Sequence, residues 1–229
     1  MKIGAIVPAA GRGMRMDKAL PKQYLPLGGK PLLARTLEVL EKSHLIDEIF
    51  LVLDSGLLNY CRKEIIIQYN LKKPMHLIKG GKTRQESVFN GLMSIGEGFG
   101  IVLIHDAVRP FIDEHTLSEV IAQASIHKAA LVAVPVSDTI KKSDPECFVS
   151  GTVPRRNLWA VQTPQAFEPG LLLRAHVKAR EDNFSATDDA SLVERLGHRV
   201  KIVEGSPWNI KITTAEDLVI AEAILREIG

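Results

Sequence analysis

The chain has 229 residues, 45% of them hydrophobic, and a formal net charge of +2 at pH 7. This length allows one sizeable core and no linker-like stretch divides it, so we expect a single domain over residues 1–229. The charge is too small to indicate a nucleic-acid partner. No signal-like segment and no apolar run of about 18 residues occurs, so we expect no membrane association and a cytoplasmic location.

The first predicted strand, residues 3–7, ends at Pro8 in a loop of small residues. The residues with little side-chain bulk are Ala9, Ala10, Gly11 and Gly13. Their backbone N–H groups can point at an anion, and nearby cations can add the charge that neutral amides lack. Those cations are Arg12, Arg15, Lys18 and Lys22. The stretch therefore predicts a polyphosphate site.

The sequence of this loop matches neither of two familiar phosphate-binding motifs. The dinucleotide fingerprint GxGxxG would need glycine at Met16, and the P-loop GxxxxGK[ST] does not occur in the chain. A tight strand-to-helix turn beside a solvated basic patch remains the alternative interpretation of these residues.

Strands and helices alternate through the rest of the chain. Helical periodicity predicts helices at 32–42, 57–68, 83–95, 113–127, 170–179, 188–196 and 215–228. Short apolar runs predict strands at 49–53, 76–78, 101–104, 130–134 and 200–203. Unbroken apolar strands that alternate with helices are typical of an α/β protein with a three-layer, doubly wound, mostly parallel sheet, which binds ligands at the carboxyl ends of its strands.

The segment 137–156 does not continue this alternation of strands and helices. It contains β-like pieces, TIKK and CFVSGTV, around the turn-forming letters SDPE, and neither piece has an obvious apolar face for the main core. We therefore expect a protruding β-arm over about 137–157 that pairs with the same arm of a second subunit and makes the protein a homodimer.

The stretch KGGKTRQESV places a second glycine pair before a predicted helix. Gly81 and Ser87 could meet a ligand near the helix N-terminus, with a backbone group and a hydroxyl. An ordinary helix-entry turn is the alternative, because Gly-Gly and Thr are common turn and capping residues.

The stretch VLIHDAVRPF sets Asp106 at the end of a buried strand. Mg²⁺ needs only one or two protein carboxylates when phosphate and water complete its shell, so Asp106 is a candidate metal ligand. Arg109, three residues later, favours a phosphorylated substrate. Capping of the following turn is the alternative role for Asp106, and no His/Cys cluster suggests zinc.

PAAGRGMRM followed by PKQYLPLGGKPLL resembles the signature of the sugar-nucleotide-type nucleotidyltransferases. The PKQY segment is most similar to that of the methylerythritol phosphate cytidylyltransferases of isoprenoid precursor synthesis. The resemblance implies a Rossmann-like nucleotidyltransferase fold that uses CTP, Mg²⁺ and a sugar-alcohol phosphate as acceptor.

The resemblance also implies roles for individual residues. Ala9, Ala10, Gly11 and Gly13 would contact CTP through the backbone, and Gly81 and Ser87 would recognise the cytosine. Arg15 and Lys22 would stabilise the transition state, and Arg155 and Lys211 would position the acceptor; Arg156 is an alternative to Arg155. The remaining substrate contacts would come from Asp106, Arg109, Thr139, Thr163 and Thr187.

Two rival functions stay open at the level of sequence. A ribitol 5-phosphate cytidylyltransferase shares the same stretches and differs in the acceptor pocket. A non-catalytic nucleotide-binding module would keep the fold but is expected to lack Lys22 or Asp106, and both are present.

Overall fold

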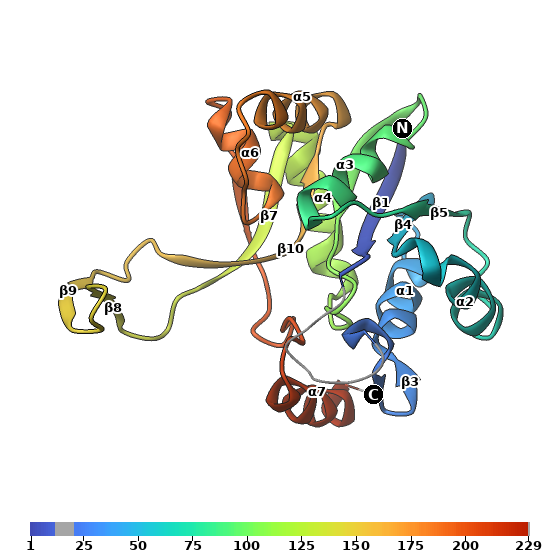
Figure 1. Cartoon of the computed structure of the whole chain (residues 1–229), viewed down its shortest axis with the longest axis horizontal. Helices are drawn as coiled ribbons and strands as arrows, with labels where there is room; N and C mark the ends of the chain where they lie inside the picture. Colours follow the sequence, from blue (N-terminus) through green and yellow to red (C-terminus); the bar gives the residue numbers. More distant parts are fainter. Residues whose placement is uncertain (12–20, 229) are drawn as a thin grey trace.

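The computed structural model describes residues 1–11 and 21–228, and a seven-stranded sheet forms its centre (Figure 1). The strands, in spatial order, are β11 (Lys201–Glu204), β7 (Ala129–Pro135), β10 (Trp159–Phe167), β6 (Phe99–Ile104), β1 (Lys2–Ala9), β4 (Glu48–Leu53) and β5 (Met75–Lys79). The helices are α1 (Leu32–Lys42), α2 (Leu58–Cys61), α3 (Arg84–Met93), α4 (Glu114–His127), α5 (Pro169–Glu181), α6 (Asp189–Arg195) and α7 (Ala215–Ile228).

The sheet is mostly parallel, as the sequence predicted. β1 pairs in parallel with β4 and β6, β4 with β5, and β11 with β7. Within the described part of this sheet, only β10 runs antiparallel to its two neighbours, β6 and β7. The chain winds outward from β1 through β4 to β5, whereas β6 lies on the other side of β1. The carboxyl ends of β1 and β6 therefore flank a topological switch point, where open α/β sheets bind their ligands.

Helices cover both faces of the sheet. One apolar cluster contains buried side chains of α1 and α4, and the other contains those of α3, α5 and α6. Alternation along β1 shows why both clusters form: Ala5 and Val7 belong to the first, and Ile6 belongs to the second. Burial on both faces accounts for the unbroken apolar runs in the sequence.

A third apolar cluster fixes α7 near the carboxyl end of the sheet. Ala221 and Ile224 of α7 pack with Leu27 and Val108. Leu27 belongs to a small hairpin, β2 (Pro26–Leu27) and β3 (Lys30–Pro31), whose turn residues Gly28 and Gly29 have positive φ. Figure 1 shows α7 and β3 together below the ends of the central strands.

Two segments differ from their predicted structure. The helix expected at 57–68 is an irregular succession of a 3₁₀ turn (Ser55–Leu57), the short α2 and a π-helical stretch (Arg62–Ile67). β10 was not predicted as a strand at all. It lies in the interior of the sheet, so the sequence analysis missed one of its central strands.

The segment after β7 leaves the body as an arm. β8 (Ile140–Ser143) and β9 (Val149–Val153) form an antiparallel hairpin that projects well away from the central sheet (Figure 1). Phe148 and Val149 at its tip are 67% and 65% exposed. The arm thus lies where the sequence placed it, with apolar side chains uncovered in the single chain.

No helix in the described part of the chain is long and apolar enough to cross a membrane.

Candidate active site

A cavity of about 560 Å³ opens where β1, β4, β5 and β6 end. It gathers residues from all three stretches singled out in the sequence. Its lining includes Ala9, Ala10, Gly11, Lys22, Gly81, Ser87, Asp106 and Lys211. Lys82, Arg84 and Asp54 also line it, so that the lining holds four cations and two carboxylates in all. A net positive, partly apolar cleft of this kind suits a nucleotide with its phosphates.

The loop after β1 is held by a buried glutamine. Gln23 donates from Nε2 to the carbonyl oxygens of Ala9, at 2.7 Å, and Gly11, at 3.1 Å. Gln23 belongs to a 3₁₀ turn (Lys22–Tyr24) whose first residue, Lys22, lines the cavity. The glutamine therefore ties the end of β1 to the turn that carries Lys22.

Gly13 and Arg15, both predicted site residues, lie outside the described residues, as do Arg12 and Lys18. Their predicted roles stay predictions.

The second glycine loop packs directly against the first. A Cβ on Gly80 would lie 2.3 Å from the Cβ of Ala10, so a larger residue would push the two loops apart. Ser87 accepts a hydrogen bond from the Gly81 N–H at 3.1 Å and donates to the Thr83 carbonyl at 2.9 Å. Ser87 was predicted to recognise the base together with Gly81. In the structure it also fixes the shape of the loop that carries Gly81.

Asp106 lies at the end of β6 among three cations. Its carboxylate is 3.0 Å from Lys211 Nζ, 3.4 Å from Arg84 Nε and 3.5 Å from Arg109 Nε. Burial alone would raise the pKa of Asp106, but the charges of Arg84, Lys211 and Arg109 outweigh it and hold the pKa well below its ordinary value. Asp106 is therefore ionised at neutral pH.

Beneath Asp106, a chain of hydrogen bonds fixes the end of β6. The Asp106 N–H donates to the Thr163 hydroxyl at 3.0 Å, and that hydroxyl lies 3.2 Å from His105 Nδ1. His105 Nε2 lies 3.0 Å from the Arg109 carbonyl. Burial lowers the pKa of His105 to about 4, so the ring is neutral and Nε2 is the donor. Thr163, predicted as a substrate contact, thus supports the backbone of Asp106.

Arg109 is buried below the cavity and does not line it. Its Nη1 donates to the Asn209 carbonyl at 2.6 Å, and Asn209 donates to the Thr163 carbonyl at 2.9 Å. In this arrangement Arg109 acts on Asp106 from behind, and a direct phosphate contact would need it to move.

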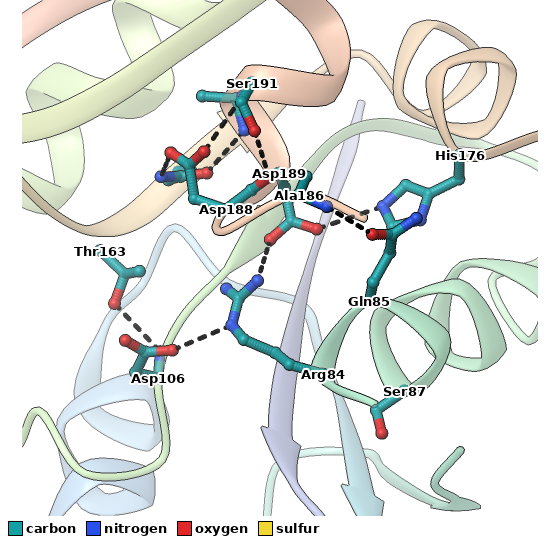
Figure 2. Close-up of polar contacts among 12 residues, drawn as sticks. Arg84, Gln85, Ser87, Asp106, Thr163, His176, Ala186, Asp188, Asp189 and Ser191 are labelled. Carbon is teal, nitrogen blue, oxygen red and sulfur yellow. Dashed lines mark hydrogen bonds and ion pairs between the residues drawn. The ribbon is translucent and has the colours of Figure 1, made fainter. Parts of the chain in front are cut away.

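A further ionic network behind the cavity was missed by the sequence analysis (Figure 2). Arg84, on the first turn of α3, lies between Asp106 and Asp189, and its Nη1 is 2.7 Å from Asp189 Oδ2. His176 of α5 contacts the other oxygen of Asp189 at 3.1 Å. These residues are separated by up to 105 positions, so no sequence spacing could reveal the contact.

The remaining predicted contacts do not line the cavity. Thr187 is exposed in the segment just before α6, a segment that Gln85 holds through the Phe184 carbonyl and the Ala186 N–H. Thr139 is exposed at the base of the arm, and Arg155 donates to the Ser137 carbonyl there. The arm residues are remote from the pocket of their own chain.

A phosphate-bound Mg²⁺ fits this donor set better than a metal caged by protein ligands. The described residues hold no cluster of three or more His, Cys, Asp or Glu side chains that could bind an ion. Asp106 offers one ionised carboxylate at the cavity wall, which suffices when phosphate oxygens and water complete the shell.

A doubly wound sheet with a cationic, glycine-lined pocket at its switch point is the architecture of the α/β nucleotidyltransferases. A family model described as 2-C-methyl-D-erythritol 4-phosphate cytidylyltransferase matches residues 3–227. The chain therefore belongs to the 2-C-methyl-D-erythritol 4-phosphate cytidylyltransferase family, as the resemblance in its sequence indicated.

Individual relatives agree over the whole chain. It is 45% identical over 227 residues to the 2-C-methyl-D-erythritol 4-phosphate cytidylyltransferase of Caldanaerobacter subterraneus subsp. tengcongensis, covering 99% of this chain and 100% of the relative. It is 48% identical over 225 residues to that of Geobacillus kaustophilus, covering 98% and 97%. The crystal structure of 4-diphosphocytidyl-2C-methyl-D-erythritol synthase from Anaerococcus prevotii matches with a TM-score of 0.87 at 35% identity, covering 98% of this chain and 96% of that one. These likenesses confirm the predicted fold class.

Proposed function

We propose that the protein transfers the CMP moiety of CTP to 2-C-methyl-D-erythritol 4-phosphate, releasing pyrophosphate and forming 4-diphosphocytidyl-2-C-methyl-D-erythritol in the non-mevalonate pathway. The observation that carries this proposal is the convergence, in one cavity, of the β1 loop, Lys22, the Gly81 loop, Asp106 and Lys211. Family membership supplies the identity of the nucleotide and the acceptor.

The reaction needs positioning and charge more than covalent chemistry. A phosphate oxygen of the acceptor attacks the α-phosphate of CTP, and the bond to the pyrophosphate oxygen breaks in line. Lys22 stabilises the negative charge that develops on the attacked phosphate, and Lys211 holds the acceptor phosphate beside Asp106. Ala9, Ala10 and Gly11 hold the nucleotide through their backbone. Arg15 and Gly13, which lie outside the described residues, are assigned to this set from the sequence alone.

Asp106 would hold Mg²⁺ together with the phosphate oxygens of CTP. The ion would supply charge neutralisation between the phosphates when bound. Lys211, 3.0 Å from the carboxylate and 38% exposed, is the cation best able to leave Asp106 and turn to a substrate phosphate.

The arm supports a homodimeric assembly. Residues 1–229 would form one nucleotidyltransferase domain, with 137–157 as a dimerisation arm whose exposed Phe148 and Val149 pack on the second subunit. Thr139 and Arg155, remote from their own pocket, would then enter the pocket of the partner by symmetry. Arg156 remains the alternative to Arg155.

The experiment that tests the function is pyrophosphate release by the purified protein with each nucleoside triphosphate and each acceptor. Turnover with CTP and 2-C-methyl-D-erythritol 4-phosphate, dependent on a divalent cation, is expected. Preference for ribitol 5-phosphate would move the assignment to the rival cytidylyltransferase. Nucleotide binding without turnover of any acceptor would favour the non-catalytic module.

A further inference from the structure

Behind the pocket, Asp189 holds Arg84 from the side opposite Asp106, and His176 in turn contacts Asp189. Asp189 is the first residue of α6 and His176 lies in the middle of α5; their side chains are 1% and 0% exposed. In Figure 2 the guanidinium of Arg84 lies between Asp106 and Asp189, with the His176 ring on the far side of Asp189. The three residues form one line of contacts from the cavity wall into the core.

The two carboxylates share Arg84 unequally. Arg84 lies 2.7 Å from Asp189 but 3.4 Å from Asp106, which is at the limit of a hydrogen bond. Asp189 is therefore the main anchor of the guanidinium. Burial raises the pKa of Asp189, but the charge of Arg84 and the hydrogen bond from His176 reverse that effect and leave its pKa lowered. An ionised Asp189 leaves the Asp106 carboxylate only loosely bound by Arg84.

Stability does not account for a histidine at position 176. Its neighbours on the buried face of α5 are apolar, namely Leu171, Leu172, Ala175 and Ala179. A carboxylate can only accept, so His176 Nε2 donates to Asp189, which leaves Nδ1 buried with no hydrogen-bond partner in the structure. An unsatisfied buried polar atom costs stability, and this cost offsets much of what the hydrogen bond to Asp189 contributes.

We propose that Asp189 and His176 are positioning residues of the active site: His176 orients Asp189, Asp189 anchors Arg84, and the anchored Arg84 sets the position of Asp106. The inference rests on the proposed function, because it takes Asp106 as a group that acts on substrate. Neither Asp189 nor His176 lines the cavity, so both act through Arg84.

The physical reason is competition for one guanidinium. If Asp189 did not hold it, Arg84 would be free to close on Asp106 and bind it more tightly. Asp106 would then be less available to a substrate phosphate with its cation. The orientation of Asp189 depends on His176, since a carboxylate with one oxygen unpaired could rotate and release Arg84. Fixing both oxygens keeps the geometry that the pocket needs.

A conservative pair of variants at position 176 tests this while Arg84 and both carboxylates stay in place. His176→Phe keeps a buried ring but has no donor, whereas His176→Gln keeps an N–H that can reach Asp189. We expect His176→Phe to lower kcat by a factor between roughly ten and a hundred, because small misplacement of reacting groups is costly. The KM for CTP should change little, since the β1 loop and the Gly81 loop do not contact His176. His176→Gln should recover most of the turnover.

Leu172→Ala is the matched control. Leu172 is buried on the same helix and makes apolar contacts only, so its truncation should lower the melting temperature and leave kcat unchanged. A merely structural role for His176 predicts that activity follows melting temperature through all three variants. Wild-type kcat in His176→Phe, or equal loss of kcat in His176→Gln and His176→Phe, would overturn the proposal.

Side-chain ¹⁵N spectra give a readout that does not need turnover. The Arg84 N–H signals, assigned with Arg84→Lys, should be sharp and slow to exchange in the wild type and in His176→Gln. They should shift in His176→Phe and in Asp189→Asn, because the guanidinium then moves from Asp189 to Asp106. Unchanged Arg84 signals in both of the latter variants would contradict the inference. A wild-type protein that turns over no acceptor would instead contradict the proposed function, whatever the spectra show.

Discussion

Asp106 at the pocket wall and Asp189 behind it are withdrawn from solvent and each contacts opposite charges, whereas in the arm Arg155, Phe148 and Val149 lie exposed. Pocket residues come from strand ends and helix starts that the sheet brings together within one chain. Arm residues form hydrogen bonds with other parts of the arm, as Arg155 does with the Ser137 carbonyl and Lys141 with the Thr152 hydroxyl.

This difference separates two kinds of functional residue. Residues at the carboxyl edge of the sheet are positioned by the fold of their own chain, so a single chain suffices to explain them. Residues on the arm have no site nearby, so any catalytic role for them requires another chain. The predictions below test the two halves of this comparison.

Asp106→Asn should have the largest effect. The amide keeps the shape of the side chain but has no charge for Mg²⁺ or for the three surrounding cations. We expect turnover to fall by about 10³ or more, since loss of a single stabilising group at an active site typically costs about 10²–10³. Asp113→Asn is the control, because Asp113 caps α4 outside the pocket. Unchanged activity and magnesium dependence in Asp106→Asn would return Asp106 to a capping role.

Lys22→Ala should lower kcat by about 10²–10³ with the fold intact, because its charge acts on the attacked phosphate. Steady-state kinetics measured beside circular dichroism and melting temperature would separate the two effects. Lys30→Ala removes a lysine that pairs with Glu38 away from the cavity and should keep normal turnover. Near-wild-type kcat in Lys22→Ala would exclude the assigned role.

Mixing subunits tests the arm. Arg155→Ala and Lys22→Ala chains should each be inactive alone. If Arg155 acts in the partner's pocket, one site of each mixed dimer carries both defects and the other carries neither. Random assortment of equal amounts should then restore about a quarter of wild-type activity. Mass spectrometry should first establish that subunits have exchanged. No recovery after exchange would mean that Arg155 acts within its own chain or has no role.

The two thiols provide the mildest test, since Cys61 lies in the apolar core of the body and Cys147 in the arm. Burial raises the pKa of Cys61 to about 12 and its side chain is inaccessible, whereas Cys147 of the arm is exposed. A thiol reagent should modify Cys147 before denaturation, faster in single chains than in a dimer that covers the arm tip, and Cys61 only after denaturation. The Cys147→Ser variant should therefore show almost no native reaction. Rapid labelling of Cys61 would indicate that the core opens more readily than its packing suggests.

The sequence revealed most of the parallel sheet but not β10. Pro164 and two glutamines, Gln162 and Gln165, make this segment look like a loop, because proline and buried amides are unusual in a central strand. The structure accommodates them with a register shift in the pairing to β7. Gln165 is satisfied by Asp188 and by the Ala190 N–H. Those partners lie at the N-terminal end of α6, so only the tertiary structure explains the polar strand.

The residues of the candidate site likewise divide into those that the sequence revealed and those that it did not. Ala9, Gly81 and Asp106 could be found because they lie shortly after predicted strands, where an α/β sheet places its ligands. Asp189 and His176 could not, because an aspartate at a helix start resembles a cap and a histidine on an apolar helix face resembles a core residue. Their role in the site depends on Arg84, which contacts Asp189 from a distant part of the sequence, while Asp189 contacts His176.

The antiparallel direction of β10 has a consequence for how the arm is joined to the body. β7 and β10 are neighbours, with Pro135 opposite Trp159, and the Val136 N–H still donates to the Leu158 carbonyl. The arm is thus the tip of one long hairpin, and the connection from β7 to β10 needs no crossover. Lengthening such a loop costs little entropy, about 0.6 kcal/mol for each doubling. The arm is in this sense a modular insertion, which the chain could shorten, extend or replace by a tight turn while the sheet keeps its register.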